Sequence, residues 1–126
     1  RISGHHTSSA PEDGTPATGN NNEPDPPSLT PSWGAEDTLW IAYYGRRGGG
    51  GTASAYPTSY TGNQYTDATG GAGSGVNIGL ATRELNAASD NPATFTKDSG
   101  DDWGALTVAV RPAAVVSNAL FFGAGV

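Results

Sequence analysis

The sequence predicts an all-β protein: an antiparallel β-sandwich of jelly-roll type, preceded by an extended N-terminal arm. Three observations predict this fold class. Short segments are rich in aromatic and β-branched residues, turn residues separate them, and no segment sustains a 3.6-residue hydrophobic period. The 126 residues suit one domain, and 35% hydrophobic residues with 19 glycines and 9 prolines predict a modest core with long connections.

Residues 1–32 are predicted to form an extended arm or linker. This segment is polar and rich in asparagine, glycine and proline, and its prolines exclude a helix and discourage a central strand. Its few apolar side chains do not offset the entropy lost on ordering. We therefore expect any order here to come from docking on another surface.

The domain itself is predicted to span residues 33–114. Asp37–Tyr44 is dense in aromatic and β-branched residues, which is typical of a strand buried on both faces. In 103–111, period-2 alternation places Leu106 and Val108 on one face and Ala105 and Thr107 on the other. Strands are expected at 37–44, 52–56, 75–85, 93–97 and 103–111, glycine-containing loops at 45–51 and 59–75, and the nearest approach to a helical turn at 86–91.

Residues 115–126 are predicted to be an apolar C-terminal tail. Such a tail is either an edge strand of its own sheet or an anchor that packs on a neighbouring subunit, and we favour the subunit contact. The candidate contact residues are Val115, Val116, Leu120, Phe121 and Phe122.

Charge and composition exclude several function classes. The net charge is −6, and the one cationic cluster is Arg46–Arg47, so no nucleic-acid partner is expected. The longest apolar stretch is far shorter than the roughly 20 residues of a membrane span, so no membrane partner is expected. Cysteine is absent, which excludes disulfides. The chain begins at Arg1 and has no methionine, so we expect a processed product or part of a longer chain.

Several strings resemble the C-terminal half of a bacteriophage virion-associated structural protein family. They are 24–34, 37–42, 55–58, 60–61, 83–89, 102–103 and 109–112, and together they extend over most of residues 24–113. The resemblance implies a place on the virion surface, as a capsid decoration or tail-associated protein, and an earlier β-rich half that ends in a string like Arg1–Gly4. It implies no catalytic residues.

The groups that could carry chemistry are few. The adjacent His5 and His6 lack the spacing of zinc ligands, and we interpret them as a solvated pair. Asp98, Asp101 and Asp102 could coordinate calcium, but an acidic turn is the simpler interpretation. The glycine-rich loops lack the helix and lysine of a phosphate cradle. No catalytic residue, metal site or cofactor is predicted, and a glycosidase pair built on Glu84 has no predicted cleft.

The aromatic residues allow a second interpretation, in which exposed rings stack on sugars. We expect Trp40 and Trp103 to fill the core instead. Tyr56, Tyr60 and Tyr65 flank loops, so they are the candidate glycan contacts if the protein is a carbohydrate-binding or host-adhesion module.

We therefore predict a non-enzymatic structural protein that acts through contacts with copies of itself and with other virion proteins. Host adhesion through a surface glycan is the alternative, and a subunit of a cellular extracellular filament is a further one.

Overall fold

The computed structural model describes residues 1–48, 52–68 and 75–114, and this part of the chain is all-β. None of these residues is helical, and the paired strands run antiparallel. The strands are β1 (Glu12–Asp13), β2 (Ala17–Gly19), β3 (Glu36–Arg47), β4 (Ala53–Ala55), β5 (Thr61–Ala68), β6 (Val76–Ala87), β7 (Thr96–Lys97) and β8 (Trp103–Val110). The predicted all-β, antiparallel class is confirmed.

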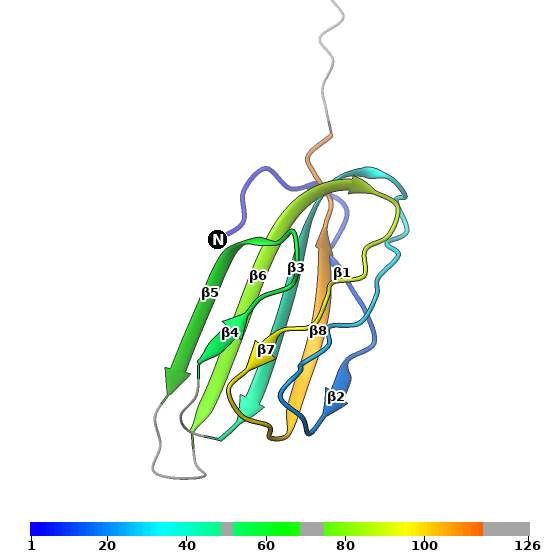
Figure 1. The fold of residues 1–126 in the computed structure, drawn as a ribbon. Coiled ribbons are helices and arrows are strands. Elements are labelled where there is room, and N and C mark those ends of the chain that lie inside the picture. The colour runs from blue at the N-terminus through cyan, green and yellow to red at the C-terminus, as the bar shows by residue number, and fades with distance from the viewer. Residues whose placement is uncertain (49–51, 69–74, 115–126) are drawn as a thin grey trace, which may run out of the picture.

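The main sheet has the spatial order β1–β8–β3–β6–β5, and β2 pairs with β8 beside β1 (Figure 1). β3 is central: it pairs with β6 from Glu36↔Ala87 to Arg47↔Val76, and with β8 from Leu39↔Val110 to Arg46↔Trp103. Its run of aromatic and branched residues packs well on a pleated surface. β4 and β7 form a separate two-stranded sheet.

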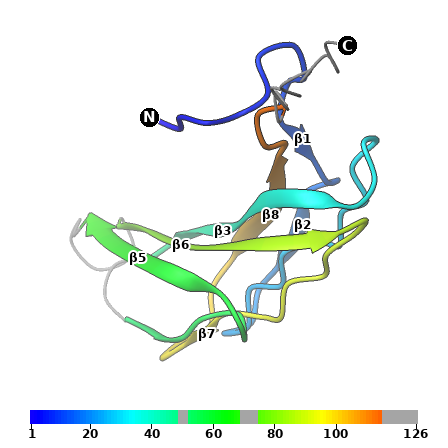
Figure 2. The same ribbon diagram turned by 90° about the horizontal axis from the view of Figure 1, so that it is seen from above.

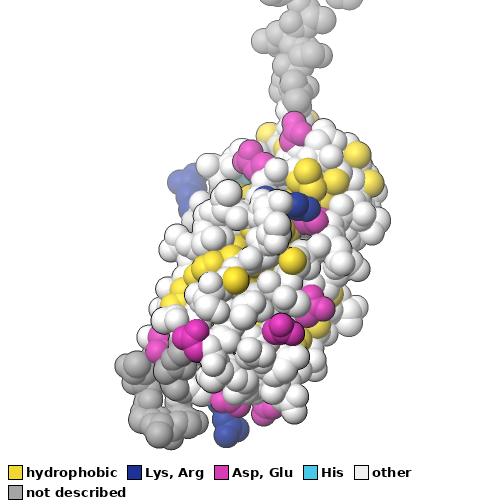
Figure 3. Space-filling view, in the orientation of Figure 1, with side chains coloured by type: hydrophobic (Ala, Val, Ile, Leu, Met, Phe, Trp, Pro, Cys, Tyr) yellow, Lys and Arg dark blue, Asp and Glu magenta, His cyan; other side chains and the backbone are white. Residues whose placement is uncertain are grey.

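The two faces of the main sheet have different surroundings. β4, β7 and the connecting segments cover one side, which we call the inner face (Figures 1 and 2). The opposite side is called the outer face. Over the covered side, most of the surface is backbone or side chains that are neither hydrophobic nor charged, with scattered acidic and apolar areas (Figure 3). The buried inner-face side chains include Thr38, Trp40, Ala42, Tyr44, Ala81, Ala105, Thr107 and Ala109.

Aromatic rings fill the space between the inner face and its cover. The Phe95 ring centroid lies 4.8 Å from that of Tyr44 and 5.8 Å from that of Tyr56, both edge-on. Gly79 is required beneath Tyr44, because a Cβ there would lie 2.2 Å from the Tyr44 Cε1 atom. Trp40 and Trp103 are buried, as predicted from the sequence.

The N-terminal segment docks on the domain of its own chain. β1 and β2 lie along β8, at an edge of the sheet where proline is tolerated. Residues 22–31 then cross the inner face, where the Phe95 N–H donates to the Pro24 carbonyl at 2.8 Å and Leu29 pairs with Asp90. Order in this segment thus comes from docking, and the surface on which it docks is the chain's own sheet.

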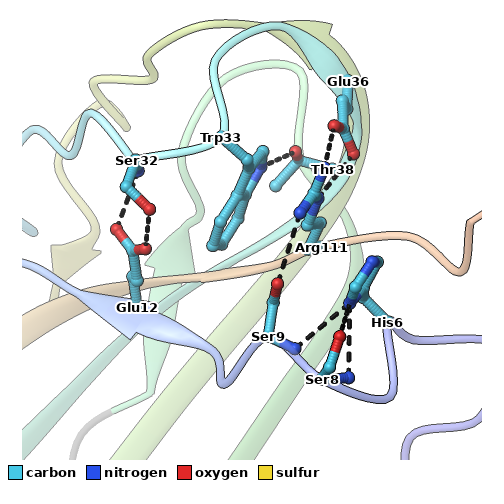
Figure 4. Close-up of polar contacts among 9 residues, drawn as sticks. All are labelled: His6, Ser8, Ser9, Glu12, Ser32, Trp33, Glu36, Thr38 and Arg111. Atoms are coloured by element: carbon cyan, nitrogen blue, oxygen red, sulfur yellow. Dashed lines mark hydrogen bonds and ion pairs between the residues drawn. The ribbon is translucent and has the colours of Figure 1, made fainter.

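Polar side chains fasten this segment at one end of the sheet (Figure 4). Glu12 accepts from the backbone N–H of Ser32 at 2.9 Å and from its hydroxyl. Arg111 donates to both oxygens of Glu36, at 2.9 and 2.6 Å, and to the Ser9 hydroxyl at 3.3 Å. These bonds connect the chain before β1 to the ends of β3 and β8.

Some sequence expectations are corrected. The loop predicted at 59–75 contains the strand β5, and the loop predicted at 45–51 begins later because β3 continues to Arg47. β6 continues to Ala87, into the segment where a helical turn was considered. β3 is buried on its inner side only, because its outward residues are only partly covered.

Candidate functional site

The residues considered for catalysis or metal binding do not converge. The Nδ1 atom of His6 accepts from the backbone N–H groups of Ser8 and Ser9, at 3.3 and 3.1 Å, and so closes a local turn (Figure 4). Glu84 is exposed on β6. Within residues 1–48, 52–68 and 75–114, no three His, Cys, Asp or Glu side chains are placed to hold a metal ion.

The acidic turn before β8 uses its carboxylates as hydrogen-bond acceptors. Asp98 accepts from the backbone N–H of Thr52 at 3.0 Å and from its hydroxyl at 2.7 Å. These bonds hold the pKa of the Asp98 carboxyl below its usual value. Asp101 accepts from the N–H of Asp102 at 2.9 Å. The Asp98 carboxylate therefore connects the turn to the residue before β4, and the Asp101 bond lies within the turn.

Tyr60, a candidate glycan contact, is only 6% exposed, so the expectation that it is accessible is wrong. Its hydroxyl donates to the buried carboxylate of Asp90, which also forms two hydrogen bonds with Arg83. The Arg83 guanidinium lies 5.0 Å from the Tyr60 ring centroid. Burial, followed by the bond to Asp90, raises the pKa of the Tyr60 hydroxyl. The three side chains form one network, in which Tyr60 and Asp90 are buried and Arg83 is partly exposed.

The other two candidate tyrosines are partly covered. Tyr56 packs edge-on against Phe95 in the core. The ring centroid of Tyr65 lies 5.4 Å from the Lys97 ammonium group, and burial raises the pKa of its hydroxyl. A glycan contact through Tyr56 and Tyr65 stays a prediction.

A buried polar cluster, which the sequence did not reveal, lies at the opposite end of the interior. Lys97 is 2% exposed, and its ammonium group donates to the Tyr44 hydroxyl at 3.3 Å and to the Asn77 side-chain carbonyl at 3.2 Å. Asn77 donates to Asp67 at 2.8 Å. Burial, and next the positive charge of Arg46, lower the pKa of Lys97. The cluster connects β7 to β3, β6 and β5.

The outer face is the most unusual surface of the described chain. Residues of β3, β6 and β8 that point away from the cover are largely apolar, and Val76 and Ile78 are 49% and 45% exposed. The core of this face, as the term is used below, comprises Ile41, Tyr43, Val76, Ile78, Leu80, Leu106 and Val108. Leu106 and Val108 thus point outward from β8, while Ala105, Thr107 and Ala109 point inward after Trp103 at the start of the strand.

Among residues 1–48, 52–68 and 75–114, the outer face is covered at one end only. Ile2 to His5 and the β8 residue Val110 line a hollow of about 90 Å³ together with Leu39. The N–H of Ala113 donates to the Gly4 carbonyl at 2.9 Å, which holds this N-terminal segment in place. In the described part of the chain, no strand lies over the rest of the outer face (Figure 2). An apolar sheet face without a cover is a candidate interaction surface.

The predicted tail contacts Val115, Val116, Leu120, Phe121 and Phe122 lie outside the described residues. Among the residues that are described, no helix has the length and hydropathy needed to cross a membrane. No family model, curated protein or solved structure matches this chain. The resemblance to a phage structural family therefore stays a prediction.

Proposed function

We propose that this chain is a non-enzymatic structural module of a larger assembly, held in place by contacts between copies of itself and with neighbouring proteins. The observation that supports the proposal is the outer face, where apolar side chains of β3, β6 and β8 have no strand of the described chain over most of their length, and where Val76 and Ile78 are 49% and 45% exposed. With the sequence resemblance added, the assembly is a bacteriophage particle, in which the module decorates the capsid surface or belongs to the tail.

Within this proposal the fold is an antiparallel β-sandwich of jelly-roll type. The main sheet is one layer, and β4, β7 and the connecting segments are a thinner second layer. The central strand pairs with β6 and β8, neither of which is the next strand in the sequence, and such non-sequential antiparallel pairing is expected in wound β-sandwiches. The thin layer covers one face of the sheet and leaves the other for a partner.

The free strand edge is a poorer contact than the face. β5 lies at one edge of the main sheet, but its pairing with β6 shifts register between Thr61 and Gln64. Gly62, inside that irregularity, has a φ of 59°. Bulged, polar edge strands resist pairing with another chain. Association through the face is therefore favoured over strand addition at β5.

The size of the face sets the strength of one contact. The three strands β3, β6 and β8, about 4.8 Å apart over about six residues of length, give a footprint of roughly 300 Å² on each copy. Burying about 600 Å² in a pair yields up to about 15 kcal/mol at 25 cal/mol per Å². The cost of association is about 4 to 15 kcal/mol. A net value of about 5 kcal/mol corresponds to a dissociation constant of roughly 0.2 mM, so stable assembly requires many contacts at once.

Sedimentation velocity from about 10 µM to about 1 mM tests the proposal. The wild-type chain should associate over this range. Ile78→Lys places a charge in the core of the face and should abolish association, with little change in folding because Ile78 is 45% exposed. Ala55→Lys is the matched control, since it adds the same charge at an exposed strand position of the covering layer.

A wild-type chain that remains monomeric at about 1 mM would refute the proposed function. Association that is equally strong in Ile78→Lys would show instead that a different surface makes the contact.

A further inference from the structure

We infer that the outer face is self-complementary, and that in a two-fold pair the Tyr43 ring of each copy enters a groove above Gly45 and Gly104 of the other. The inference rests on the proposed function and names the partner and the residues of the same surface.

The groove is a hollow of about 700 Å³ at the uncovered end of the outer face. Gly45 and Gly104 are cross-strand partners on β3 and β8, and they lie side by side in its floor. Val76 and Ile78 of β6 form an apolar wall. Thr18 and Asn20, beside β8, form a polar wall, and Arg47 and Asp102 also line the hollow.

The fold does not require glycine at the two floor positions. The described glycines with positive φ are Gly4, Gly34, Gly48 and Gly62, so neither floor glycine has left-handed backbone. Within the described chain, a Cβ added at Gly45 would have no atom within 4 Å, and one added at Gly104 would meet only the Ala17 carbonyl, at 3.9 Å.

The inner face gives the opposite result, because a Cβ on Gly79 would collide with Tyr44. Glycine weakens a strand interior and often marks a place where another group approaches closely. Since nothing in the described chain approaches the two floor glycines, the approaching group is assigned to a partner.

A ridge lies directly beside this groove. Tyr43 is two residues from Gly45 on β3, about 7 Å along the strand, and both side-chain positions are on the outer face. Its cross-strand partners are Leu80 and Leu106, so three large side chains cross the sheet in one row. The next row along β3 holds Gly104, Gly45 and Ile78, and it is low over the glycines.

One ridge beside one groove is the arrangement that a two-fold axis can pair. The two-fold axis lies in the plane midway between the two sheets, at right angles to the strands, and passes over the midpoint between Tyr43 and Gly45. Rotation about this axis places each ridge over the partner's groove. The contact is isologous, because the same patch serves on both copies. The sheets pack face to face at about 10 Å, a spacing that side chains from both faces fill.

The chemistry of the rows fits a buried contact. No charged side chain occurs among the β3, β6 and β8 residues of the three rows through Ile41, Tyr43 and Gly45. Tyrosine suits the role of anchor because its ring is apolar and its hydroxyl needs a partner. The polar wall supplies one, since the hydroxyl oxygen of Thr18 or the side-chain carbonyl of Asn20 can accept a hydrogen bond from the Tyr43 hydroxyl.

A pair of opposite variants tests the inference by sedimentation velocity of the full chain. Tyr43→Ala removes the ridge, and Gly45→Val fills the groove. Each variant alone should associate at least tenfold more weakly than wild type. An equimolar mixture should recover much of the association, because Tyr43 of the Gly45→Val chain enters the free groove of the Tyr43→Ala chain. The isopropyl group introduced by Gly45→Val then faces the space left by the missing ring.

Circular dichroism and thermal unfolding of each variant check that the fold is retained. If Gly45→Val does not fold, Gly104→Ala fills the same groove with one methyl group and replaces it in the mixture. Wild-type association in both single variants, or no recovery on mixing, overturns the inference. If Ile78→Lys still abolishes association in that case, the proposed function stands; a monomeric wild-type chain overturns both.

Discussion

Replacing Asp90 with alanine should destabilise the protein strongly, because its buried carboxylate serves two partners. The Asp90 side chain is 4% exposed and that of Arg83 is 21% exposed. Tyr60 donates its hydroxyl to the same carboxylate from a buried position. The backbone of Asp90 also pairs with Leu29, so the network stands where the N-terminal segment crosses the inner face.

The expected loss follows from these exposures. Breaking a buried ion pair costs about 3 to 5 kcal/mol, and the partial exposure of Arg83 puts this case at the lower end. Leaving the buried Tyr60 hydroxyl without its acceptor adds about 1 kcal/mol to this loss. Asp90→Ala should therefore lose about 3 to 4 kcal/mol of unfolding free energy, or about 12 to 20 °C in Tm for a domain of this size.

Urea unfolding followed by tryptophan fluorescence measures this loss, and a double-mutant cycle isolates its cause. Arg83→Met alone should lose about 3 kcal/mol of unfolding free energy. The double variant should lose about the same as Asp90→Ala alone, because either single substitution already breaks the ion pair. Glu84→Ala, an exposed carboxylate next to Arg83 in sequence, is the control and should change stability by less than about 0.5 kcal/mol. A loss under about 1 kcal/mol for Asp90→Ala, or additive single effects, would refute the reasoning.

Three further predictions concern pH and packing. The hydrogen bond from Arg111 holds the pKa of Glu36 below its ordinary value of 4.5, so the ionised Glu36 stabilises the fold above pH 4.5 and this stabilisation is lost as the pH falls through the folded pKa. Glu36→Gln should therefore reduce the difference between the urea midpoints at pH 7 and pH 3. An unchanged difference contradicts this. Burial raises the pKa of Tyr44 and Tyr60 above the ordinary 10.0, so the free energy of unfolding should fall as the pH rises past 10. In an absorbance titration these two hydroxyls should ionise only when the protein unfolds. Smooth titration of all tyrosines in the folded state is the contrary result. Gly79→Val should lose at least about 2 kcal/mol of unfolding free energy, because a Cβ at position 79 meets Tyr44 at 2.2 Å. Gly45→Ala, with nothing of the described chain within 4 Å of the new Cβ, should change stability by less than about 1 kcal/mol in chemical denaturation. Equal losses would show that the space around the added Cβ does not decide the effect.

Strands with a strong pattern could be predicted from the sequence, and strands defined by their neighbours could not. The aromatic run of β3 and the alternation of β8 carry their own signal. β5 reads Thr-Gly-Asn-Gln-Tyr-Thr-Asp-Ala and lies at a sheet edge, where a polar strand costs little, so its composition resembles a loop. β1 and β2 have two and three residues, too short for any periodicity.

Alternation in 103–111 revealed two faces but not which one points inward. The inner space is filled from other elements by Trp40, Tyr44 and Phe95, so after Trp103 at its start β8 has room there only for small side chains such as Ala105 and Thr107. The larger Leu106 and Val108 therefore point outward. This distribution of volume depends on tertiary packing, and for that reason the candidate surface was not among the residues predicted from the sequence.

The buried state of Lys97 could have been suspected from its position. It lies two residues after Phe95, so an extended chain places both side chains on the same side. The charge argues against burial in isolation. The structure resolves the conflict by surrounding the ammonium group with Tyr44, Tyr65 and Asn77.

The most direct test of the central claim is a solvent-accessibility measurement at single introduced cysteines. The chain has no cysteine, so Ile78→Cys and Ala55→Cys each carry one spin label on a defined face. As the concentration rises from about 10 µM to about 1 mM, the label at position 78 should lose accessibility to a soluble relaxation agent while the label at position 55 keeps it. Constant accessibility at position 78, in a chain that sediments as a multimer, would contradict the claim that the outer face is the contact between subunits.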